Sequence, residues 1–499
     1  MNAINYLVTP EQMQVLEKLT DNSGICYQEM MEQAGHALAM ELLLEYPDCQ
    51  KFLFLVGTGN NGGDCYVAGY YLKLKQKQVE FLAPMGEPKT EISKNAYNRV
   101  MKNKIPVKSE PDYFYEQAEI IIDGLFGTGF HGELPETLQK LLISENNQIH
   151  VACDIPSGGN GLTGQVSAGI FKADLTITFG AEKFGMSQYP LRSYCGKIKI
   201  ADIGIPEQAF FKIQPITRLD LEQVKNNLPE RKPDAYKNQF GHVLAVTGSC
   251  RMRGACVLAV TACMRAGAGL VTCASAEQAL SAIAVRMPEI MCLPLELDRN
   301  GFFLNNMMNQ EILKNALQNK QALLIGCGMG VTQETQNLTK FLLSQSSCPV
   351  ILDADGLNCI ASCIEYVPRG RTILTPHAGE AGRLLNISTE EVQKDRFHSA
   401  KKLAELTGAV VILKGAGTII TDGKQTSVCN QGNAGMAKAG SGDVLAGMTA
   451  SFVAQGLDLY QSACTAVMLH AVAGDKTADK LPYYYMLPQD LIDSLKDIL

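Results

Sequence analysis

The stretch KFLFLVGTGNNGGDCYVAGYYLKLKQK (51–77) decides the fold class of this chain. An apolar run occupies 51–56, a glycine-rich loop follows at 57–64, and 67–77 has an amphipathic helical pattern. Glycines permit positive φ angles and let backbone amides approach a phosphate, and the dipole of the following helix favours an anion there. The stretch therefore predicts a strand, a glycine loop and a helix of an α/β sheet. Tight turns use the same glycines, so the loop alone leaves a purely structural role open.

The rest of the first half repeats the pattern. EIIID (119–123), IHVACD (149–154) and DLTITF (174–179) are short apolar runs typical of buried parallel strands. Upstream, the segments 9–19 and 27–46 have helical patterns, the first with Thr9 as its N-cap and Pro10 at its first position. Strands that alternate with helices predict a Rossmann-like three-layer sandwich with helices on both faces of the sheet.

A second α/β series begins near residue 241. Two helical patterns, 254–267 and 442–456, accompany a set of strand-like runs: HVLAVTG (242–248), LVTCAS (270–275), ALLIGCG (322–328), PVILDAD (349–355), TILTPH (372–377), AVVILKG (409–415) and GTIITDG (417–423). The polar stretch 228–240, with two prolines and no period, is the linker candidate. We therefore expect two α/β domains, 1–215 and 222–499.

Composition restricts the class of protein. The chain has 499 residues, 46% of them apolar and 19% charged, which is typical of globular domains. Its net charge of −7 argues against a nucleic-acid partner. No apolar run approaches the roughly 20 residues that a bilayer requires, and the first residues do not have the pattern of a signal peptide. The 16 cysteines are scattered without a C-x-x-C pair, so we expect reduced core residues and a cytoplasmic protein.

Polar side chains follow the strands of the first half. Asp123 and Asp154 each close a strand and precede a glycine-rich loop, 124–133 and 155–161. In an open α/β sheet, ligands bind outside the carboxyl ends of the strands. Three residues there would offer oxygen ligands that suit a hard cation: Asn61, Asp123 and Ser157. Taken singly, each acid is equally well explained as a helix cap or a turn residue.

The motifs GNNGGD (59–64), DGLFGTG (123–129) and DIPSG (154–158), with MEQAG (31–35), resemble the YjeF N-terminal family of NAD(P)H-hydrate epimerases. This resemblance covers about residues 1–215 and implies K⁺ at Asn61, Asp123 and Ser157, and a catalytic role for Asp154. It also implies substrate contacts from two loops and from the catalytic acid: Asn60, Asn61, Gly62, Gly63, Asp64, Gly127, Thr128, Gly129, Phe130, His131, Gly132, Glu133 and Asp154. Cys65 stands where the family usually has glycine, at the expected start of the helix.

The strongest motif of the second half is NAGMAKAGSGDVLAG (433–447). Its G-x-G-D sequence at the start of a helix places free amides and the positive end of the helix dipole against a phosphate. An acid beside that phosphate, Asp443, can take the proton of an attacking hydroxyl. The alternative is that Asp443 only caps the helix.

Other glycine-rich motifs end neighbouring strands. Lys414 and Thr418 of ILKGAGTII (412–420) are candidates to hold nucleotide phosphates or ribose. His377 of TPHAGE (375–380) is by itself more simply explained as a structural residue. The remaining members of the set are GSCRMRGACVLAVTACMRAGAGLVT (248–272), IGCGMG (325–330) and DADGLN (353–358).

Together these motifs resemble the ribokinase-like superfamily, and within it the ADP/ATP-dependent NAD(P)H-hydrate dehydratases, over about 222–499. The resemblance implies substrate contacts from Ala255, Gly328, His377 and Asp443, although Gly326 and Gly330 are alternatives to Gly328 within IGCGMG. It implies Mg²⁺, ADP as co-substrate, and a set of nucleotide contacts: Lys414, Gly415, Ala416, Gly417, Thr418 and Gly442. Gly356 stands where the family commonly has alanine.

The two resemblances together imply one function. Hydration of NADH or NADPH gives R and S hydrates, NADHX and NADPHX. The first domain would interconvert these epimers, and the second would dehydrate the S form with ADP, giving NAD(P)H, AMP and phosphate. We expect small-molecule substrates, no membrane partner and a homo-oligomer. The alternative is a ribokinase-like small-molecule kinase with a non-catalytic N-terminal binding module.

Overall fold

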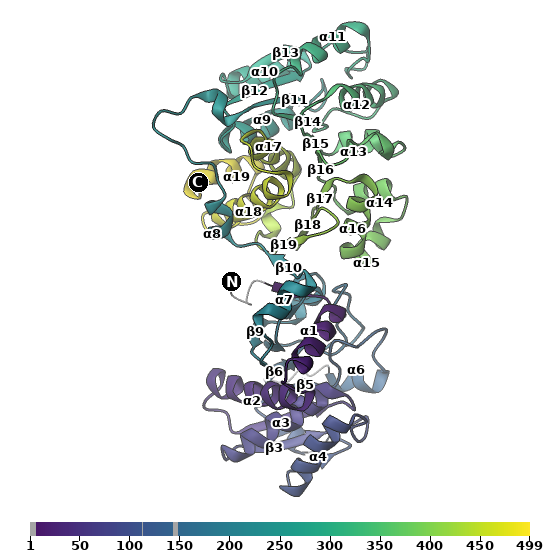
Figure 1. Cartoon of the computed structure of the whole chain (residues 1–499), viewed down its shortest axis with the longest axis vertical. Helices are drawn as coiled ribbons and strands as arrows, with labels where there is room; N and C mark the ends of the chain where they lie inside the picture. The colour runs from purple at the N-terminus through teal and green to yellow at the C-terminus, as the bar shows by residue number, and fades with distance from the viewer. Residues whose placement is uncertain (1–5, 112, 143–147) are drawn as a thin grey trace. The chain divides into compact units, whose positions relative to one another are not determined.

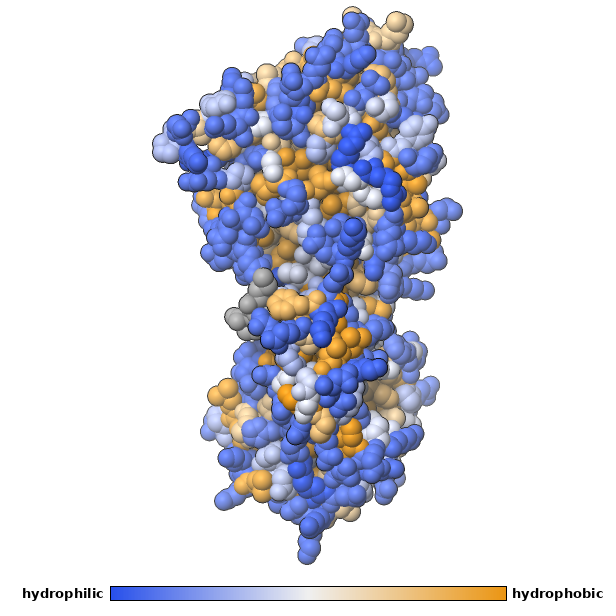
Figure 2. All heavy atoms as spheres, viewed as in Figure 1, coloured by the Kyte–Doolittle hydropathy of each residue, from blue (hydrophilic) through white to orange (hydrophobic). Residues whose placement is uncertain are grey.

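The computed structural model describes residues 6–111, 113–142 and 148–499 (Figure 1). The chain divides into two compact units, Met1–Thr217 and Arg218–Leu499. Among the described residues, no helix is both long and apolar enough to cross a membrane. Hydrophilic side chains dominate the face seen in Figure 2, with apolar ones in scattered groups.

The first unit is built on a parallel sheet of seven strands in the order β4-β3-β2-β5-β6-β7-β9. The strands are β2 (Lys51–Val56), β3 (Gln78–Leu82), β4 (Val107–Lys108), β5 (Ile120–Gly124), β6 (Ile149–Cys153), β7 (Leu175–Phe179) and β9 (Lys197–Ala201). The helices are α1 (Pro10–Asn22), α2 (Tyr27–Glu45), α3 (Asn60–Leu74), α4 (Glu91–Lys102), α5 (Tyr113–Gln117), α6 (Glu136–Leu142) and α7 (Glu207–Ile213). A short ladder joins β1 (Tyr6–Val8) to β8 (Glu182–Lys183) and β10 (Ile216–Arg218).

Alternation along β2 explains the three layers of this unit. Phe52 and Phe54 enter one apolar core, which α1 to α4 cover, whereas Leu53 and Leu55 enter the core on the opposite face. Because successive side chains of a strand point to opposite faces, a continuously apolar strand must be covered on both. The strand order reverses at β2, since β3 lies on one side of it and β5 on the other, and such a switch point is where open α/β sheets bind ligands.

The second unit has nine strands in the order β13-β12-β11-β14-β15-β16-β17-β18-β19, parallel up to β17 and antiparallel from there to β19. They are β11 (His242–Val246), β12 (Leu270–Ser275), β13 (Met291–Pro294), β14 (Ala322–Ile325), β15 (Val350–Leu352), β16 (Thr372–Leu374), β17 (Val410–Leu413), β18 (Thr418–Thr421) and β19 (Thr426–Cys429). Here the order reverses at β11, which lies between β12 and β14.

Helices cover both faces of this sheet as well. Figure 1 shows α12, α13, α14 and α16 along one side of β14–β17, with α17 and α18 along the other. The helices are α8 (Leu221–Asn226), α9 (Arg253–Arg265), α10 (Glu277–Arg286), α11 (Met307–Ala316), α12 (Gln333–Gln345), α13 (Asp355–Ile360), α14 (Ala378–Leu385), α15 (Thr389–Lys394), α16 (Arg396–Thr407), α17 (Ser441–Ala454), α18 (Leu459–Ala478) and α19 (Pro488–Ser494).

Two expectations from the sequence need correction. Helix α3 begins at Asn60, so the residues of NNGGD form its first turns, and Cys65 lies fully buried in its second turn rather than at its start. The linker candidate 228–240 belongs to the second unit. The Arg231 guanidinium donates to the Gly267 carbonyl, and Leu228 packs against the core of that unit. These contacts, which polarity and prolines do not reveal, tie the segment down.

A close contact between two helices of the second unit tests this architecture. A β-carbon at Gly447 of α17 would lie 2.0 Å from the Ala259 carbonyl oxygen of α9. We expect Gly447→Ala to push these helices apart and lower the free energy of unfolding by about 1–3 kcal/mol, as overpacking of a core does. Gly254→Ala is the matched control, because nothing lies within 4 Å of its β-carbon. Denaturant unfolding followed by circular dichroism measures both, and equal stability of the two variants would contradict the packing.

Candidate functional sites

A cavity of about 470 Å³ opens at the switch point of the first unit. Its lining includes most of the residues that the sequence predicted for this site: Asn60, Asn61, Asp64, Gly127, Thr128, Gly129, Phe130 and Asp154. They come from the first turns of α3, from the loop after β5 and from the end of β6. The structure thus brings three segments that are far apart in the sequence to one cavity.

Other predicted contacts lie outside the cavity lining. Gly62 and Gly63 are buried in α3, where a β-carbon would lie 2.2 Å from the Gly57 carbonyl oxygen and 2.5 Å from Met31, respectively. These glycines permit close packing of α3. His131, Gly132 and Glu133 also lie outside the lining. The Glu133 carboxylate instead accepts a hydrogen bond of 2.8 Å from the Ser167 hydroxyl.

The three predicted oxygen ligands, Asn61, Asp123 and Ser157, lie around the backbone of Phe126, at the wall of the cavity. The Asp123 carboxylate accepts bonds from the Ser157 hydroxyl (2.6 Å) and amide (2.7 Å). The Ser157 hydroxyl oxygen accepts from the Phe126 amide (2.9 Å), and the Asn61 side-chain amide donates to the Phe126 carbonyl (3.0 Å). Burial raises the pKa of Asp123 to about 6, although the bonds from Ser157 act in the opposite direction. The carboxylate therefore lies in a site that disfavours its charge.

Asp154 has a buried counterion that the sequence analysis missed. The Lys183 ammonium donates to the Asp154 carboxylate, to the Thr178 hydroxyl (2.9 Å) and to the Phe179 carbonyl (3.1 Å), and its side chain is only 1% exposed. Asp154 adopts a left-handed φ of +67°, which non-glycine residues rarely adopt. Three bonds fix the lysine, and Asp154 lines the cavity. A lone lysine 29 residues after its partner has no local sequence signal.

Further acids surround the same cavity. Burial raises the pKa of Glu17, although the charge of Lys183 lowers it. The pKa of Asp64 is raised well above its usual value, first by burial and then by the carboxylates of Asp154 and Glu17. Glu17, on α1, was missed as well. The cavity therefore combines an ion pair with two carboxyl groups whose pKa values are raised, which is an arrangement able to move protons.

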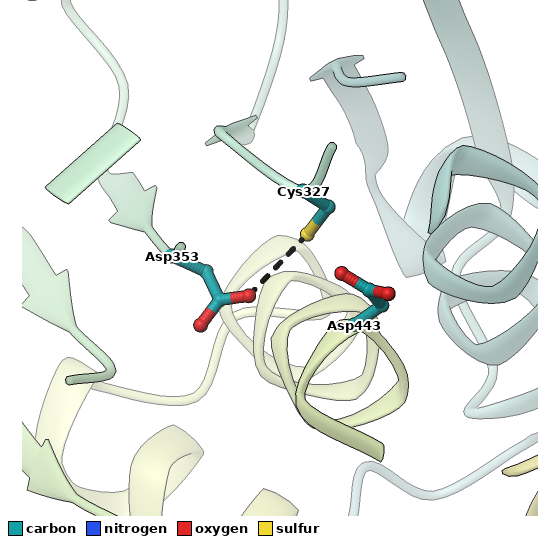
Figure 3. Close-up of side chains that lie close together, drawn as sticks. All are labelled: Cys327, Asp353 and Asp443. Atoms are coloured by element: carbon teal, nitrogen blue, oxygen red, sulfur yellow. Dashed lines mark hydrogen bonds between the residues drawn. The ribbon is translucent and has the colours of Figure 1, made fainter. Parts of the chain in front are cut away.

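The second unit gathers its polar groups where β14 and β15 meet the first turn of α17 (Figure 3). Side-chain ligand atoms of Cys327, Asp353 and Asp443 lie within 4.8 Å of one another. The Cys327 thiol donates to Asp353 over 3.6 Å. Burial, followed by the charge of Asp353, raises the pKa of Asp443 to about 7, although Cys327 and Lys414 act against this rise. A carboxylate with such a pKa is suited to general-base catalysis near neutral pH.

Lys414 connects this cluster to the glycine loops. Its ammonium donates to Asp353 over 2.8 Å and lies 3.8 Å from the Glu380 carboxylate. Burial lowers the pKa of Lys414, but these two carboxylates outweigh it, and the net pKa is raised. A β-carbon at Gly442 would lie 3.3 Å from the ammonium, so the lysine reaches the G-x-G-D turn. The structure thus unites Lys414, Gly442 and Asp443 as the sequence predicted.

The buried Arg396 holds the KGAGT loop and was missed by the sequence analysis. Its guanidinium donates to the carbonyls of Leu413 (3.2 Å) and Gly417 (3.4 Å). Within the loop, Gly415 and Ala416 are exposed, and the Thr418 hydroxyl donates to the Gly415 carbonyl over 2.8 Å. Arg396 therefore holds the loop from its buried side, while Gly415 and Ala416 remain exposed to solvent.

The remaining predicted residues form two groups. Gly328, with a φ of +64°, packs on Ala255, since a β-carbon on it would lie 2.7 Å from that of Ala255. His377 caps α14, and its ring nitrogen accepts from the Gly379 amide over 3.0 Å. The ring is nonetheless 55% exposed and lies 3.4 Å from Glu380, which in turn contacts Lys414. The capping role and a contact role are compatible.

Comparison with known proteins agrees with both halves. Residues 27–185 match the family model of the YjeF-related protein N-terminus, and residues 243–497 match that of NAD(P)H-hydrate dehydratase. A bifunctional NAD(P)H-hydrate repair enzyme, Nnr, of Coxiella burnetii is 35% identical over 97% of each chain. The enzyme of that name from Escherichia coli is 31% identical over 96% of this chain and 91% of its own.

A solved structure agrees with the fold of the second unit. A ribokinase-like superfamily protein from Enterococcus faecalis is 26% identical, with a TM-score of 0.50, and the match covers 56% of this chain and 95% of that one. The expected α/β fold class and the ribokinase-like half are therefore confirmed, and the relatives favour repair over the small-molecule kinase alternative. The chain belongs to the family of bifunctional NAD(P)H-hydrate repair enzymes, which combine an epimerase with a dehydratase.

Proposed function

We propose that the cavity of the first unit epimerises NAD(P)H hydrates, and that the Asp443 site of the second unit dehydrates the S epimer at the expense of ADP. The observation that carries the proposal is the position of Asp443, in the first turn of α17 directly after the Gly-Ser-Gly turn and in reach of Lys414. Intact protein supplied with mixed R and S hydrates and ADP should regenerate all of the dinucleotide. Release of free phosphate distinguishes repair from a kinase reaction, which would leave a stable phosphorylated product.

In the first unit, Asp154 is the group that moves the proton. Inverting a carbon that bears a hydroxyl requires one of its bonds to break and re-form, and a proton must be removed and returned in the process. Lys183 keeps the Asp154 carboxylate in place, and the residues from 127–130 line the cavity beside it. Apolar side chains such as Met30 and Ile92 complete the lining and suit a nicotinamide ring.

Asn61, Asp123 and Ser157 would hold the K⁺ ion. Their side chains offer amide, carboxylate and hydroxyl oxygens, which suit a hard cation, and the Phe126 carbonyl lies among them. The raised pKa of Asp123 marks a buried carboxylate that a cation would stabilise. A bound K⁺ would supply positive charge beneath the loops that contact the substrate.

In the second unit, the phosphoryl group passes from ADP to the hydroxyl of the hydrate. Asp443 takes the hydroxyl proton as the oxygen attacks phosphorus, and AMP leaves. The phosphate ester then loses phosphate together with a proton from the adjacent ring carbon, which restores the double bond of NAD(P)H. Free amides at the start of α17 and the Lys414 ammonium hold the phosphates. The Asp353 carboxylate suits Mg²⁺, which would neutralise phosphate charge, whereas the Cys327 thiol does not suit that ion.

Asp443→Asn tests the proposed base. The amide keeps the size of the side chain but cannot accept the proton, so we expect dehydration to slow by about 10²–10⁴ while ADP still binds. For the unchanged protein, kcat/KM of dehydration should rise with pH up to about 7, because Asp443 must be ionised to act. Single-turnover recovery of NADH and calorimetric ADP binding measure these effects, and epimerisation serves as the internal control. A variant that binds ADP and turns over within a few-fold of wild type would falsify the role.

Asp123→Asn tests the potassium site. KCl should raise the thermal unfolding temperature of the wild-type protein more than choline chloride does, because an ion that binds only the folded state stabilises it. The variant should lose this difference and most of its epimerase activity, while dehydration of the S epimer is unchanged. Thallium soaked into crystals should give anomalous density among Asn61, Asp123 and Ser157. If KCl still raises the unfolding temperature of the variant more than choline chloride does, by as much as in the wild type, the ion binds elsewhere.

Lys183→Met tests the counterion of Asp154. Removing one partner of a buried pair leaves the other charge uncompensated, so we expect a loss of about 3–5 kcal/mol in the free energy of unfolding together with loss of epimerisation. Lys199→Met is the control, since Lys199 pairs with Glu41 and Glu45 near the surface. That pair should contribute only about 0–1 kcal/mol. Denaturant unfolding of both variants gives the comparison. Similar losses in the free energy of unfolding would contradict the expectation that the Asp154–Lys183 pair behaves as a buried pair.

A further inference from the structure

Glu17 is a carboxyl group of the first-unit cavity that proton transfer by Asp154 leaves unused. It lies on α1, four residues after Met13, and both of these side chains line the cavity. Because residues four apart lie on one face of a helix, α1 presents this face to the cavity. Asp154 and Lys183 belong to the same lining. Two carboxyl groups from distant elements, α1 and the end of β6, therefore face one space.

The surroundings of these two carboxyl groups differ. Glu17 is half-buried, and its carboxyl has no hydrogen bond or ion pair with any residue that the structure describes. The Asp154 carboxylate instead accepts from the Lys183 ammonium. The same oxygen accepts from the Thr178 hydroxyl (3.0 Å) and the Phe179 amide (3.1 Å). Such donors stabilise the charged form of Asp154, whereas Glu17 has none.

The charged and titratable groups near Glu17 come from β8, the end of β6, α3 and α2: Lys183, Asp154, Asp64 and Tyr27. Burial raises the pKa of Glu17, the Lys183 ammonium lowers it, and the Asp154 carboxylate raises it again, with a raised pKa as the net result. Glu17 therefore keeps its proton to a higher pH than an ordinary glutamic acid does. Two carboxyl groups whose environments differ in this way are suited to separate roles, one as an acid and one as a base.

We propose that Glu17 is a second catalytic residue of epimerisation and acts as the acid for which Asp154 is the base, an inference that rests on the epimerase function proposed for this cavity. In the hydrate, the hydroxyl is on the ring carbon next to the nitrogen. Glu17 protonates this hydroxyl, and water leaves with the electron pair of the C–O bond while the nitrogen lone pair forms a C=N bond.

Inversion follows from the second half of the reaction. Another water molecule attacks the opposite face of the ring, the C=N pair returns to nitrogen, and the Asp154 carboxylate takes the proton of that water. Transfer of this proton to Glu17 through solvent restores the starting state. One water leaves and one arrives, so the hydrate keeps its composition, and the same steps in reverse convert the S epimer to the R epimer.

Asp64 is the alternative acid in the same cavity. Burial, and then the carboxylates of Asp154 and Glu17, raise its pKa well above the usual value. An acid catalyst works best when its pKa lies near the working pH, because it must give up its proton in each cycle. The smaller rise at Glu17 therefore favours Glu17 as the proton donor.

Glu17→Gln tests the acid in the intact protein, supplied with the R epimer and no ADP so that dehydration does not proceed. The amide keeps the size of the side chain but has no acidic proton, so formation of the S epimer should slow by about 10²–10⁴. Glu11→Gln is the matched control, because Glu11 is an exposed residue of α1 outside the cavity lining. It should epimerise as wild type does, and all three proteins should dehydrate the S epimer equally when ADP is added.

These outcomes separate the inference from the function on which it rests. A wild-type protein that does not interconvert the epimers overturns the epimerase function itself. A wild-type protein that does so, with a Glu17→Gln variant within a few-fold of its rate, overturns only the role of Glu17.

The pH profile separates an acid from a structural residue. For wild type, kcat/KM of the conversion from R to S should fall as pH rises through the pKa of Glu17, because ionisation removes the proton to be donated. Glu17→Asp should retain such a fall, and the residual activity of Glu17→Gln should not show it. An unchanged fall in Glu17→Gln overturns the assignment, and its loss in Asp64→Asn instead identifies Asp64 as the acid.

Water labelled with ¹⁸O tests which bond breaks. Since the arriving water comes from solvent, the S epimer that wild type forms from the unlabelled R epimer should carry ¹⁸O in its hydroxyl. Incubation without protein measures the spontaneous exchange to be subtracted. Retention of the unlabelled oxygen would mean that the C–N bond of the ring opens instead, and would overturn the protonation of a leaving hydroxyl by Glu17.

Discussion

The direction of the parallel strands is the constraint on which both sites depend. Strands that run the same way end at the same edge, so the residues just after β5 and β6, or after β14 and β15, meet although long segments separate them in sequence. Where the strand order reverses, at β2 and at β11, the flanking connections diverge and leave the ends accessible. Glycine loops and the first turns of α3 and α17 then supply backbone amides beside these side chains. The same topology thus produces two different sites in one chain.

Both sites use buried charge in the same way. In each, a lysine neutralises one carboxylate, as Lys183 does for Asp154 and Lys414 does for Asp353. In each, a second carboxylate lacks a fixed lysine, and burial raises its pKa, to about 6 for Asp123 and about 7 for Asp443. The carboxylate without a lysine is then suited to bind a cation or accept a proton, because burial disfavours its charge. In each unit, the acid with a lysine partner is therefore held as an ion pair, and the acid without one is left to bind a cation or a proton.

The strands and the glycine motifs could be predicted from the sequence. The side chains that hold the motifs in place could not. β2, β5 and β6 were predictable because continuous apolar runs must be buried on both faces, and Asp123, Asp154 and Asp443 because they follow strand ends or open a helix. Lys183 and Arg396 were not predictable, since their partners are distant in sequence and a single basic residue has no pattern. The start of α3 was misplaced because two glycines looked like a loop, whereas close packing against Gly57 and Met31 stabilises them in a helix.

Cys327 shows why spacing alone does not define a site. With Asp353 and Asp443 it forms a set of the size that holds a metal ion. Burial, and then the charges of both carboxylates, raise the pKa of its thiol well above the usual value, so the group remains protonated and donates to Asp353. That bond occupies one oxygen of Asp353, while Lys414 and the Thr375 hydroxyl (2.6 Å) occupy the other. With both of its oxygens engaged, Asp353 is fixed in place. Asp443 is therefore the carboxylate of the set best able to accept a proton.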